Sequence, residues 1–282
     1  MHTNRKSPAA QAASPDSVCS LLIMRLVLKL LLLFPCIACA QTALLERIQT
    51  ARLLKVCIWP EYYGISFRNP RTNQLAGIDI DMAGELAKSL NAKLEFVDSS
   101  FARLIEDVSG GRCDIAMFAI GVTPKRAQFL RFTRPYLESD IYAITSRGNR
   151  RIKSWGDIDQ PGVVVAVAEG TLHEGVMRDK LAHATLRVMT TSYARELEVE
   201  SGRADVFMTD FPYSRRMLET TDWARLVSPP GVYHLTPYAY AIKPGDDNWF
   251  DHVERFLVEV KRDGRLLASA KRHKLERILV AD

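Results

Sequence analysis

The sequence predicts an α/β protein with two lobes, each a β-sheet flanked by helices, joined by two extended strands that cross between them. Short apolar runs alternate with segments of helical periodicity, which is the pattern of parallel βα units. The alternation is broken at residues 136–146 and 237–242, where longer extended runs stand without a helix. A chain of 282 residues is long enough for two domains of ordinary size.

The predicted strands are short apolar runs of the kind that a parallel sheet buries on both faces. They comprise residues 54–58, 93–97, 115–120, 163–168, 186–189 and 204–208. The predicted helices carry apolar residues three or four positions apart. They begin with a helix opened by residues 77–81 and continue with residues 101–108, 155–158, 172–181, 193–201, 213–219, 249–263 and 265–279. We expect Asp79 or Asp81 to cap the first of them.

Two related segments precede a strand in each half of the chain. The first reads GGRCD at residues 110–114, and the second reads SGRAD at residues 201–205. The second half therefore repeats the organisation of the first. Ligand sites in such sheets lie at the carboxyl ends of the strands. We expect these edges to face each other across a cleft between the lobes.

Residues 1–40 are predicted to be a leader and signal peptide. Residues 25–40 contain two basic residues, an apolar run of about ten residues and an Ala-Cys-Ala cleavage site. This run is too short for a membrane span, which needs roughly 20 residues. We expect translation to start at Met24 and the mature chain to begin near Gln41. A lipoprotein that starts at Cys39 is the alternative, although the residues before it make a poor lipobox.

Composition limits the classes of partner and cofactor. The net charge is +5, and the leader holds four basic residues against one acidic residue, so the mature chain is near neutral and a nucleic-acid partner is not expected. Three of the five cysteines lie in the leader; Cys57 and Cys113 form either a disulfide or two buried thiols, and we favour the thiols. Without a CxxC or His/Cys cluster, we expect no metal and no cofactor. The six histidines are expected to lie on the surface or to be hydrogen-bonded.

The segment from residue 111 to residue 136 has the features of an anion site. Its strand ends at Gly121, and the sequence TPKR then begins a short helix that contains Arg126. A strand that leads into a helix leaves free backbone N–H groups and a positive dipole end. Arg126 adds a planar fork that binds a carboxylate through two hydrogen bonds. Because a cation is unfavourable at a helix start, we expect Arg126 to bind a ligand.

The same segment resembles the bacterial periplasmic solute-binding proteins, family 3, that deliver polar amino acids to ABC transporters. The markers stand in the family's order: GIDID at 77–81, DIAM with TxxR at 114–126, FTRPY at 132–136, EGT at 169–171 and GRAD at 202–205. The resemblance covers roughly residues 53–279. It implies the type II periplasmic-binding-protein-like fold. Lobe 1 would comprise residues 41–143 plus 239–282, and lobe 2 residues 144–238.

The resemblance also implies how the α-carboxylate of an amino acid is bound. In the family this group meets the Arg of TxxR, which is Arg126 in this sequence. It also takes a backbone N–H near Gly121 and groups at the turn formed by Gly170 and Thr171.

The ligand's α-ammonium is expected to meet Asp210 and a backbone carbonyl near Ala119. Tyr62, with Trp59 beside it, matches the aromatic residue that covers the ligand, and Phe101 matches a position that packs on its side chain. The residues alone also allow purely structural roles for these side chains. Asp210 has the position of a helix N-cap, and the three aromatic residues can belong to the core.

We therefore expect a periplasmic, monomeric protein that binds one L-amino acid and delivers it to the permease of an ABC importer. The position that is often acidic in binders of cationic amino acids is Trp59, and Glu61 is out of phase with it. A neutral or aromatic amino acid is favoured for that reason.

Two other functions are compatible with the same fold. Residues 157–163 and 208–210 also resemble the cyclohexadienyl (arogenate/prephenate) dehydratases. Their chemistry needs a protonated carboxyl group over the leaving hydroxyl. That family supplies it three residues after the strand-end Asp, where this chain has Tyr213, so a binding protein is favoured over an enzyme. A ligand sensor is the further alternative, and it would need a separate membrane protein for signalling.

Overall fold

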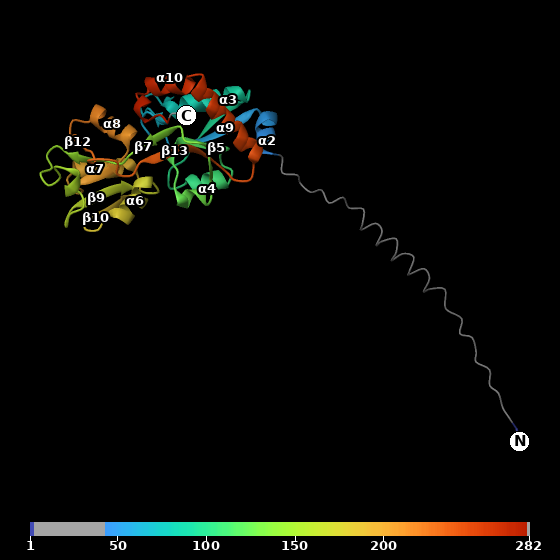
Figure 1. Ribbon diagram of the computed structural model, residues 1–282, viewed down its shortest axis with the longest axis horizontal. Helices are drawn as coiled ribbons and strands as arrows, with labels where there is room; N and C mark the ends of the chain where they lie inside the picture. Colours follow the sequence, from blue (N-terminus) through green and yellow to red (C-terminus); the bar gives the residue numbers. More distant parts are fainter. Residues whose placement is uncertain (3–42, 281–282) are drawn as a thin grey trace. The chain divides into compact units, whose positions relative to one another are not determined.

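The computed structural model describes residues 1–2 and 43–280. Residues 43–280 form two β-sheets, each flanked by helices (Figure 1). Apart from residues 1–2, the predicted leader and its Met24 start lie outside the described residues. In the described part of the chain, no helix has the length and apolar character needed to cross a membrane.

The first sheet has the strand order β4-β1-β5-β13-β6, and β7 pairs with β13 beside it. Its strands are β1 (Leu53–Ile58), β4 (Lys93–Asp98), β5 (Ile115–Gly121), β6 (Arg131–Phe132), β7 (Leu137–Ser139) and β13 (Thr236–Ile242). The strands β4, β1 and β5 run parallel, whereas β13 is antiparallel to β5. Every residue of β5 is buried, as the continuous apolar run predicted.

The second sheet has the order β10-β9-β11-β8-β12. Its strands are β8 (Tyr142–Ser146), β9 (Val164–Ala168), β10 (Thr185–Met189), β11 (Val206–Thr209) and β12 (Ala224–Val227). The strands β10, β9 and β11 are parallel, and β8 is antiparallel to both β11 and β12. The predicted limits of the lobes remain a prediction; two of them fall inside β8 and β13.

The helices cover the faces of the two sheets. Around the first sheet these are α2 (Leu44–Ala51), α3 (Ile78–Ser89), α4 (Leu104–Ser109), α5 (Pro124–Ala127), α9 (Asp247–Arg262), α10 (Arg265–Arg272) and the 3-10 turn η2 (Glu276–Ile278). Around the second they are η1 (Trp155–Asp157), α6 (Leu172–Lys180), α7 (Ser192–Glu200) and α8 (Phe211–Thr220). Figure 1 shows α3, α9 and α10 together on one side of the first sheet and α4 on the other. A short hairpin of β2 (Phe67–Arg68) and β3 (Leu75–Ala76) follows β1.

The extended run predicted at residues 136–146 is divided between the two sheets. Its first part is β7 and its second part is β8, with Asp140 between them. The Asp140 carboxylate accepts hydrogen bonds from the backbone N–H groups of Tyr233 (2.8 Å) and His234 (2.6 Å). These two residues lie in the return connection just before β13. Asp140 therefore ties the two crossing segments to each other.

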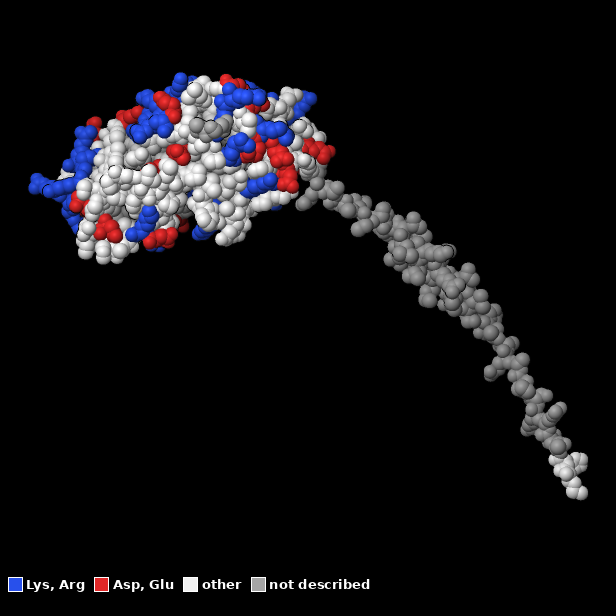
Figure 2. Space-filling model, viewed as in Figure 1, with Lys and Arg blue, Asp and Glu red and all other residues white. Residues whose placement is uncertain are grey.

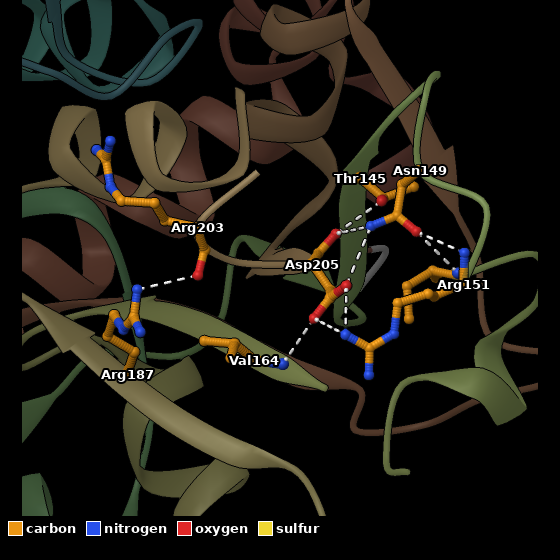
Figure 3. Close-up of polar contacts among 8 residues, drawn as sticks. Thr145, Asn149, Arg151, Val164, Arg187, Arg203 and Asp205 are labelled. Carbon is orange, nitrogen blue, oxygen red and sulfur yellow. Dashed lines mark hydrogen bonds and ion pairs between the residues drawn. The ribbon is translucent and has the colours of Figure 1, made fainter. Parts of the chain in front are cut away.

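The repeated Asp of the GGRCD and SGRAD segments has the same structural role in both halves. Asp114 accepts a hydrogen bond from the backbone N–H of Lys55 (2.8 Å), and Asp205 accepts one from Val164 (2.9 Å). Each Asp also donates its own N–H to the carbonyl of that same residue. Figure 3 shows Asp205 between Val164 and the guanidinium of Arg151. Each Asp thus fastens the start of one strand to the neighbouring strand.

The prediction that Asp79 or Asp81 caps α3 is wrong. The N-cap is Gly77, and no side chain caps this helix. A Cβ at Gly77 would lie 2.1 Å from the carbonyl oxygen of Ile65, so only glycine fits there. Asp79 is fully buried, and Asp81 accepts a hydrogen bond from Ser269 of α10. Both carboxylates serve tertiary contacts that the local sequence does not reveal.

The preference for two free thiols is also wrong, because Cys57 and Cys113 form a disulfide. Cys57 lies in β1, and Cys113 stands just before β5, which pairs with β1. The pairing brings the two Cα atoms to 5.5 Å. Smaller differences concern the helices and strands: α2, β6 and β12 were not predicted, and the predicted helix 265–279 ends at Arg272.

Candidate functional site

Eight of the nine residues predicted for the site line one small cavity. They are Trp59, Tyr62, Phe101, Ala119, Gly121, Arg126, Thr171 and Asp210. The ninth, Gly170, is adjacent, and its carbonyl oxygen accepts a hydrogen bond from Arg126. The first six come from segments around β1, β4, β5 and α5 of the first sheet, and the other two follow β9 and β11 of the second. The cavity therefore lies where the strand ends of the two sheets meet.

Arg126 is held at the start of the short helix α5. Its backbone N–H donates to the side chain of the N-cap, Thr123, at 3.2 Å. The guanidinium is buried and donates to the carbonyl oxygens of Gly121 (2.8 Å) and Gly170 (3.0 Å). It lies 5.3 Å from the centre of the Phe101 ring. Burial lowers the pKa of Arg126 to about 10, so the group stays charged at neutral pH and keeps donors free for an anion.

Asp210 is both a helix cap and part of the cavity wall. Its Oδ1 accepts the backbone N–H of Tyr213 at 3.1 Å, which caps α8. Its Oδ2 accepts the hydroxyl groups of Tyr62 and Tyr238, the latter at 2.9 Å. Burial raises the pKa of Asp210, although these three donors oppose the shift. Because Tyr62 and Tyr238 belong to the first sheet's side of the cavity and Asp210 to the second, these hydrogen bonds join the lobes.

Gly170 sits where the two lobes touch. It follows β9 and has a φ of +71°, a conformation that favours glycine. A Cβ at this position would lie 2.5 Å from the backbone of Ala102, between β4 and α4. The Gly170 N–H is already bonded to the carboxylate of Glu174 at 2.7 Å. The carbonyl oxygen of Gly170 therefore contacts Arg126 of the cavity wall, whereas its N–H is already used within the turn.

Aromatic rings form the rest of the wall. The ring centre of Trp59 lies 5.1 Å from those of both Tyr62 and Phe101. The Trp59 ring is also parallel to that of Tyr213 in α8, at 6.4 Å. Trp59 and Tyr62 are buried, which is compatible with both the core and the ligand-covering alternatives of the sequence. The packing of Trp59 on Tyr213 gives the lobes an apolar contact in addition to the hydrogen bonds.

The sequence profile of the bacterial extracellular solute-binding proteins, family 3, matches residues 54–275. The chain belongs to this family. Among curated relatives, this solute-binding protein is 32% identical to the cyclohexadienyl dehydratase of Pseudomonas aeruginosa over 238 residues, which cover 84% of the chain and 88% of the relative. It is 24% identical to the putative ABC transporter arginine-binding protein 2 of Escherichia coli over 220 residues, 77% of the chain and 87% of the relative.

A solved structure has the same architecture. The ancestral amino-acid-binding protein AncCDT-1, described as a precursor of cyclohexadienyl dehydratase, matches with a TM-score of 0.74 at 30% identity. The match covers 81% of the solute-binding protein and 98% of AncCDT-1. It confirms the predicted two-lobe fold and the suspected family. The similarity to the dehydratases, expected to be the weaker one, is at 32% identity higher than the 24% identity to the Escherichia coli arginine-binding protein.

Six further residues of the solute-binding protein line the cavity and were not predicted as ligand-binding residues. They are Leu172, His173, Arg195, Thr209, Tyr213 and Tyr238. For Arg195 the sequence held a signal, because the buried face of α7 also contains Ser192 and Val199, three and four positions away. An arginine on the buried face of a short helix is unusual and indicates a special environment.

His173 corrects the expectation that all histidines lie on the surface or are hydrogen-bonded. It is buried in the cavity wall, and neither ring nitrogen has a hydrogen bond of normal geometry. Burial, together with the charges of Arg195 and Arg126, lowers the pKa of His173 to about 3. The imidazole is therefore neutral at physiological pH. Within residues 43–280, no group of three or more His, Cys, Asp or Glu side chains has the arrangement of a metal site.

Proposed function

We propose that this protein binds one L-amino acid in the cavity between its lobes, in the periplasm, and presents it as a monomer to the permease of an ABC importer. One observation carries the proposal. Arg126 and Asp210 bring opposite charges from different lobes to one cavity wall. Both side chains are buried, and among the described residues they form no ion pair with each other. Each is thus available to a ligand charge of opposite sign.

The physical reason is the cost of removing a zwitterion from water. Its carboxylate and its ammonium each lose hydration, so each needs a hydrogen-bonded partner of opposite charge. Arg126 can offer several of its five N–H donors to the carboxylate, since two contacts engage backbone carbonyls. Asp210 accepts three hydrogen bonds of the roughly four that a carboxylate can take, so one position remains for the ammonium. Binding both charges would link the ligand to lobe closure.

The wall around these two groups bears on the ligand's side chain. Trp59 and Phe101 offer aromatic surface on which the apolar part of a ligand side chain can pack. Asp210 is the one carboxylate among the described lining residues, and it is assigned to the ammonium. A second ammonium or guanidinium would therefore lack an anionic partner, which argues against lysine and arginine as ligands.

The test is a thermal-shift screen of protein that has been refolded to strip bound ligand. The panel contains the standard amino acids, prephenate and arogenate. A ligand at 100 times its dissociation constant stabilises the folded state by about 2.7 kcal/mol, which is readily measured. We expect a shift with a small set of amino acids, lost in Arg126→Ala. A panel of amino acids that all leave the melting temperature unchanged would overturn the proposal.

The second candidate is a cyclohexadienyl dehydratase, which the 32% identity to the Pseudomonas aeruginosa enzyme favours. Tyr213 stands where that family has its carboxylic acid. Burial raises the pKa of Tyr213, and its hydroxyl is bonded to Glu196 and Arg216 behind the cavity. It is therefore a poor proton donor to a leaving hydroxyl. Turnover of prephenate or arogenate by the purified protein would favour the enzyme over the binding protein.

A further inference from the structure

Arg195 is a buried arginine of the cavity wall, and among the residues that the structure describes it has no acidic partner. Its side chain is 2% exposed, and its Nη1 donates to the carbonyl oxygen of Met208 at 2.8 Å. The guanidinium lies over the rings of Tyr213 (4.5 Å) and Phe207 (4.9 Å). Its Nε is buried and has no hydrogen-bond partner. Contacts with a carbonyl and with ring faces orient this cation, but they do not neutralise its charge.

The acidic residues near Arg195 are committed elsewhere. Its sequence neighbour Glu196 pairs with Arg216 at 2.7 Å, and within residues 43–280 no ion pair includes Arg195. The charge of Arg195 acts on Asp210 and on Glu61. Glu61 is exposed to solvent, and Asp210 already holds two tyrosine hydroxyls and a backbone N–H. Neither is a dedicated counter-ion for this arginine.

The charges of the cavity wall therefore do not balance. Arg126 and Arg195 are positive, and Asp210 is the single acidic side chain among the described lining residues. His173 contributes no charge, because its pKa is about 3. Tyr62 and Tyr238 also stay neutral, since burial raises the pKa of both hydroxyls well above their usual range. The wall carries one positive charge more than a zwitterion can neutralise.

We propose that Arg195 receives a second acidic group of the ligand, so that the cavity selects an amino acid with an acidic side chain in place of the neutral or aromatic one expected from the sequence. The inference rests on the proposed function, because it takes the α-carboxylate to Arg126 and the α-ammonium to Asp210. An α-amino dicarboxylic acid carries one net negative charge and balances the wall. A neutral side chain would leave Arg195 buried beside the ligand without an anion, which is costly.

The orientation of Arg195 suits this role. A carboxylate is bound best by two parallel N–H groups of one guanidinium edge. The Met208 carbonyl occupies Nη1, whereas Nε, at the other end of the planar group, is unpaired. The rings of Tyr213 and Phe207, which stand at 88° to each other, both pack against the guanidinium and restrict its movement. The edge that contains Nε is the part of Arg195 that remains for a carboxylate.

The experiment compares ligands of matched shape that differ in charge. Calorimetry on the ligand-stripped protein measures aspartate against asparagine and glutamate against glutamine, with 2-aminoadipate as a longer diacid. We expect at least one acidic ligand to bind at least about 30-fold more tightly than its amide, the lower end for a desolvated charge pair. Amides that bind as tightly as the acids, or neutral amino acids that bind while no acid does, would overturn this inference and leave the proposed function intact.

Variants then assign the preference to Arg195. Arg195→Met should bring the ratio of the affinities for acid and amide close to one. The ratio for Arg195→Lys should lie between that of Arg195→Met and that of the unchanged protein, because the fork is lost but the charge remains. Arg187→Met is the matched control. Arg187 of β10 pairs with Glu198, which lies on the same helix as Arg195, and Arg187 does not line the cavity. A ratio that Arg195→Met leaves unchanged would overturn the inference. If Arg195→Met does not fold, Arg195→Lys supplies the same comparison. Failure of every amino acid to bind would instead overturn the proposed function.

Discussion

The Asp79 Oδ2 atom accepts a hydrogen bond of 2.8 Å from the backbone N–H of Ala119, a cavity-lining residue with a φ of +48°. A left-handed backbone costs a residue with a Cβ about 1–2 kcal/mol. Tyr136 donates its hydroxyl to the same carboxylate oxygen at 2.6 Å and accepts from the Ala119 N–H at 3.2 Å, through its own oxygen. A buried acid outside the cavity thus holds the shape of the strand end at which the ligand is proposed to bind.

Asp79→Asn should change how stability depends on pH. Burial raises the pKa of Asp79 to about 7, although hydrogen bonds from Tyr136, Ala119 and Tyr240 oppose this shift. The folded chain therefore keeps this proton at pH values where the unfolded chain has lost it. The resulting stability is fully present below about pH 4 and is lost as the pH rises through about 7. Urea unfolding at several pH values should show a fall of roughly 2–4 kcal/mol over this range that Asp79→Asn removes.

Asp81→Asn is the control with the opposite sign. Burial raises the pKa of Asp81, but hydrogen bonds from His273, Ser269 and Arg272 outweigh this and bring the pKa well below its usual range. Its contribution is present above about pH 4 and is lost as the pH falls below the pKa of the unfolded chain. An Asp79→Asn protein with the same pH slope as the unchanged chain would contradict the assignment.

Arg126→Ala should weaken ligand binding by about 2–5 kcal/mol, the range for truncating one partner of a buried charge pair. Arg126→Lys should fail as well, because a single ammonium cannot replace the contacts to Gly121, Gly170 and a carboxylate. Calorimetry with the amino acid found in the screen measures both. Arg131→Ala is the control, since Arg131 pairs with Asp247 outside the cavity. Unchanged affinity in Arg126→Ala would remove Arg126 from the proposed site.

Gly170→Ala should prevent the lobes from reaching the arrangement seen here. The added Cβ would meet the Ala102 backbone at 2.5 Å, a distance that real Cβ atoms do not reach, and the φ of +71° adds strain. We expect ligand affinity to fall at least tenfold, about 1.4 kcal/mol, while each lobe keeps its fold. Gly175→Ala in α6 is the matched control, because nothing lies within 4 Å of a Cβ there. Small-angle scattering would test the same point, since the variant should stay open when ligand is added.

Removal of the disulfide should destabilise the folded chain. Cys57 and Cys113 are 56 residues apart, and closing a loop of that length in the unfolded chain is worth about 4 kcal/mol in the chain-entropy treatment. The double variant Cys57→Ser/Cys113→Ser should therefore unfold at a lower urea concentration. The unchanged protein in reducing buffer should behave alike. Equal midpoints with and without reductant would show that the bridge does not constrain the chain in solution.

Local patterns allowed most strands and helices to be predicted. Buried strands such as β5 and β9 are continuous apolar runs, and the helix after β11 begins with a capping Asp and a Pro. These signals depend only on residues that are close together in the chain, so they can be recognised in a single sequence. Arg126 was predicted from the strand-to-helix pattern together with the family resemblance, and Asp210 from the resemblance; both stand near strand ends, where such sheets place their ligand sites.

The sequence by itself determined the order of strands and helices, the family, and the two opposite charges at the strand ends. Tertiary structure alone decided that Cys57 meets Cys113, that Asp79 holds Ala119, and that Arg195 lines the cavity with no counter-ion among the described residues. The physical reason is the range of each interaction. Backbone preferences and apolar periodicity act over a few residues, whereas the energy of a buried charge depends on every group that folding brings around it.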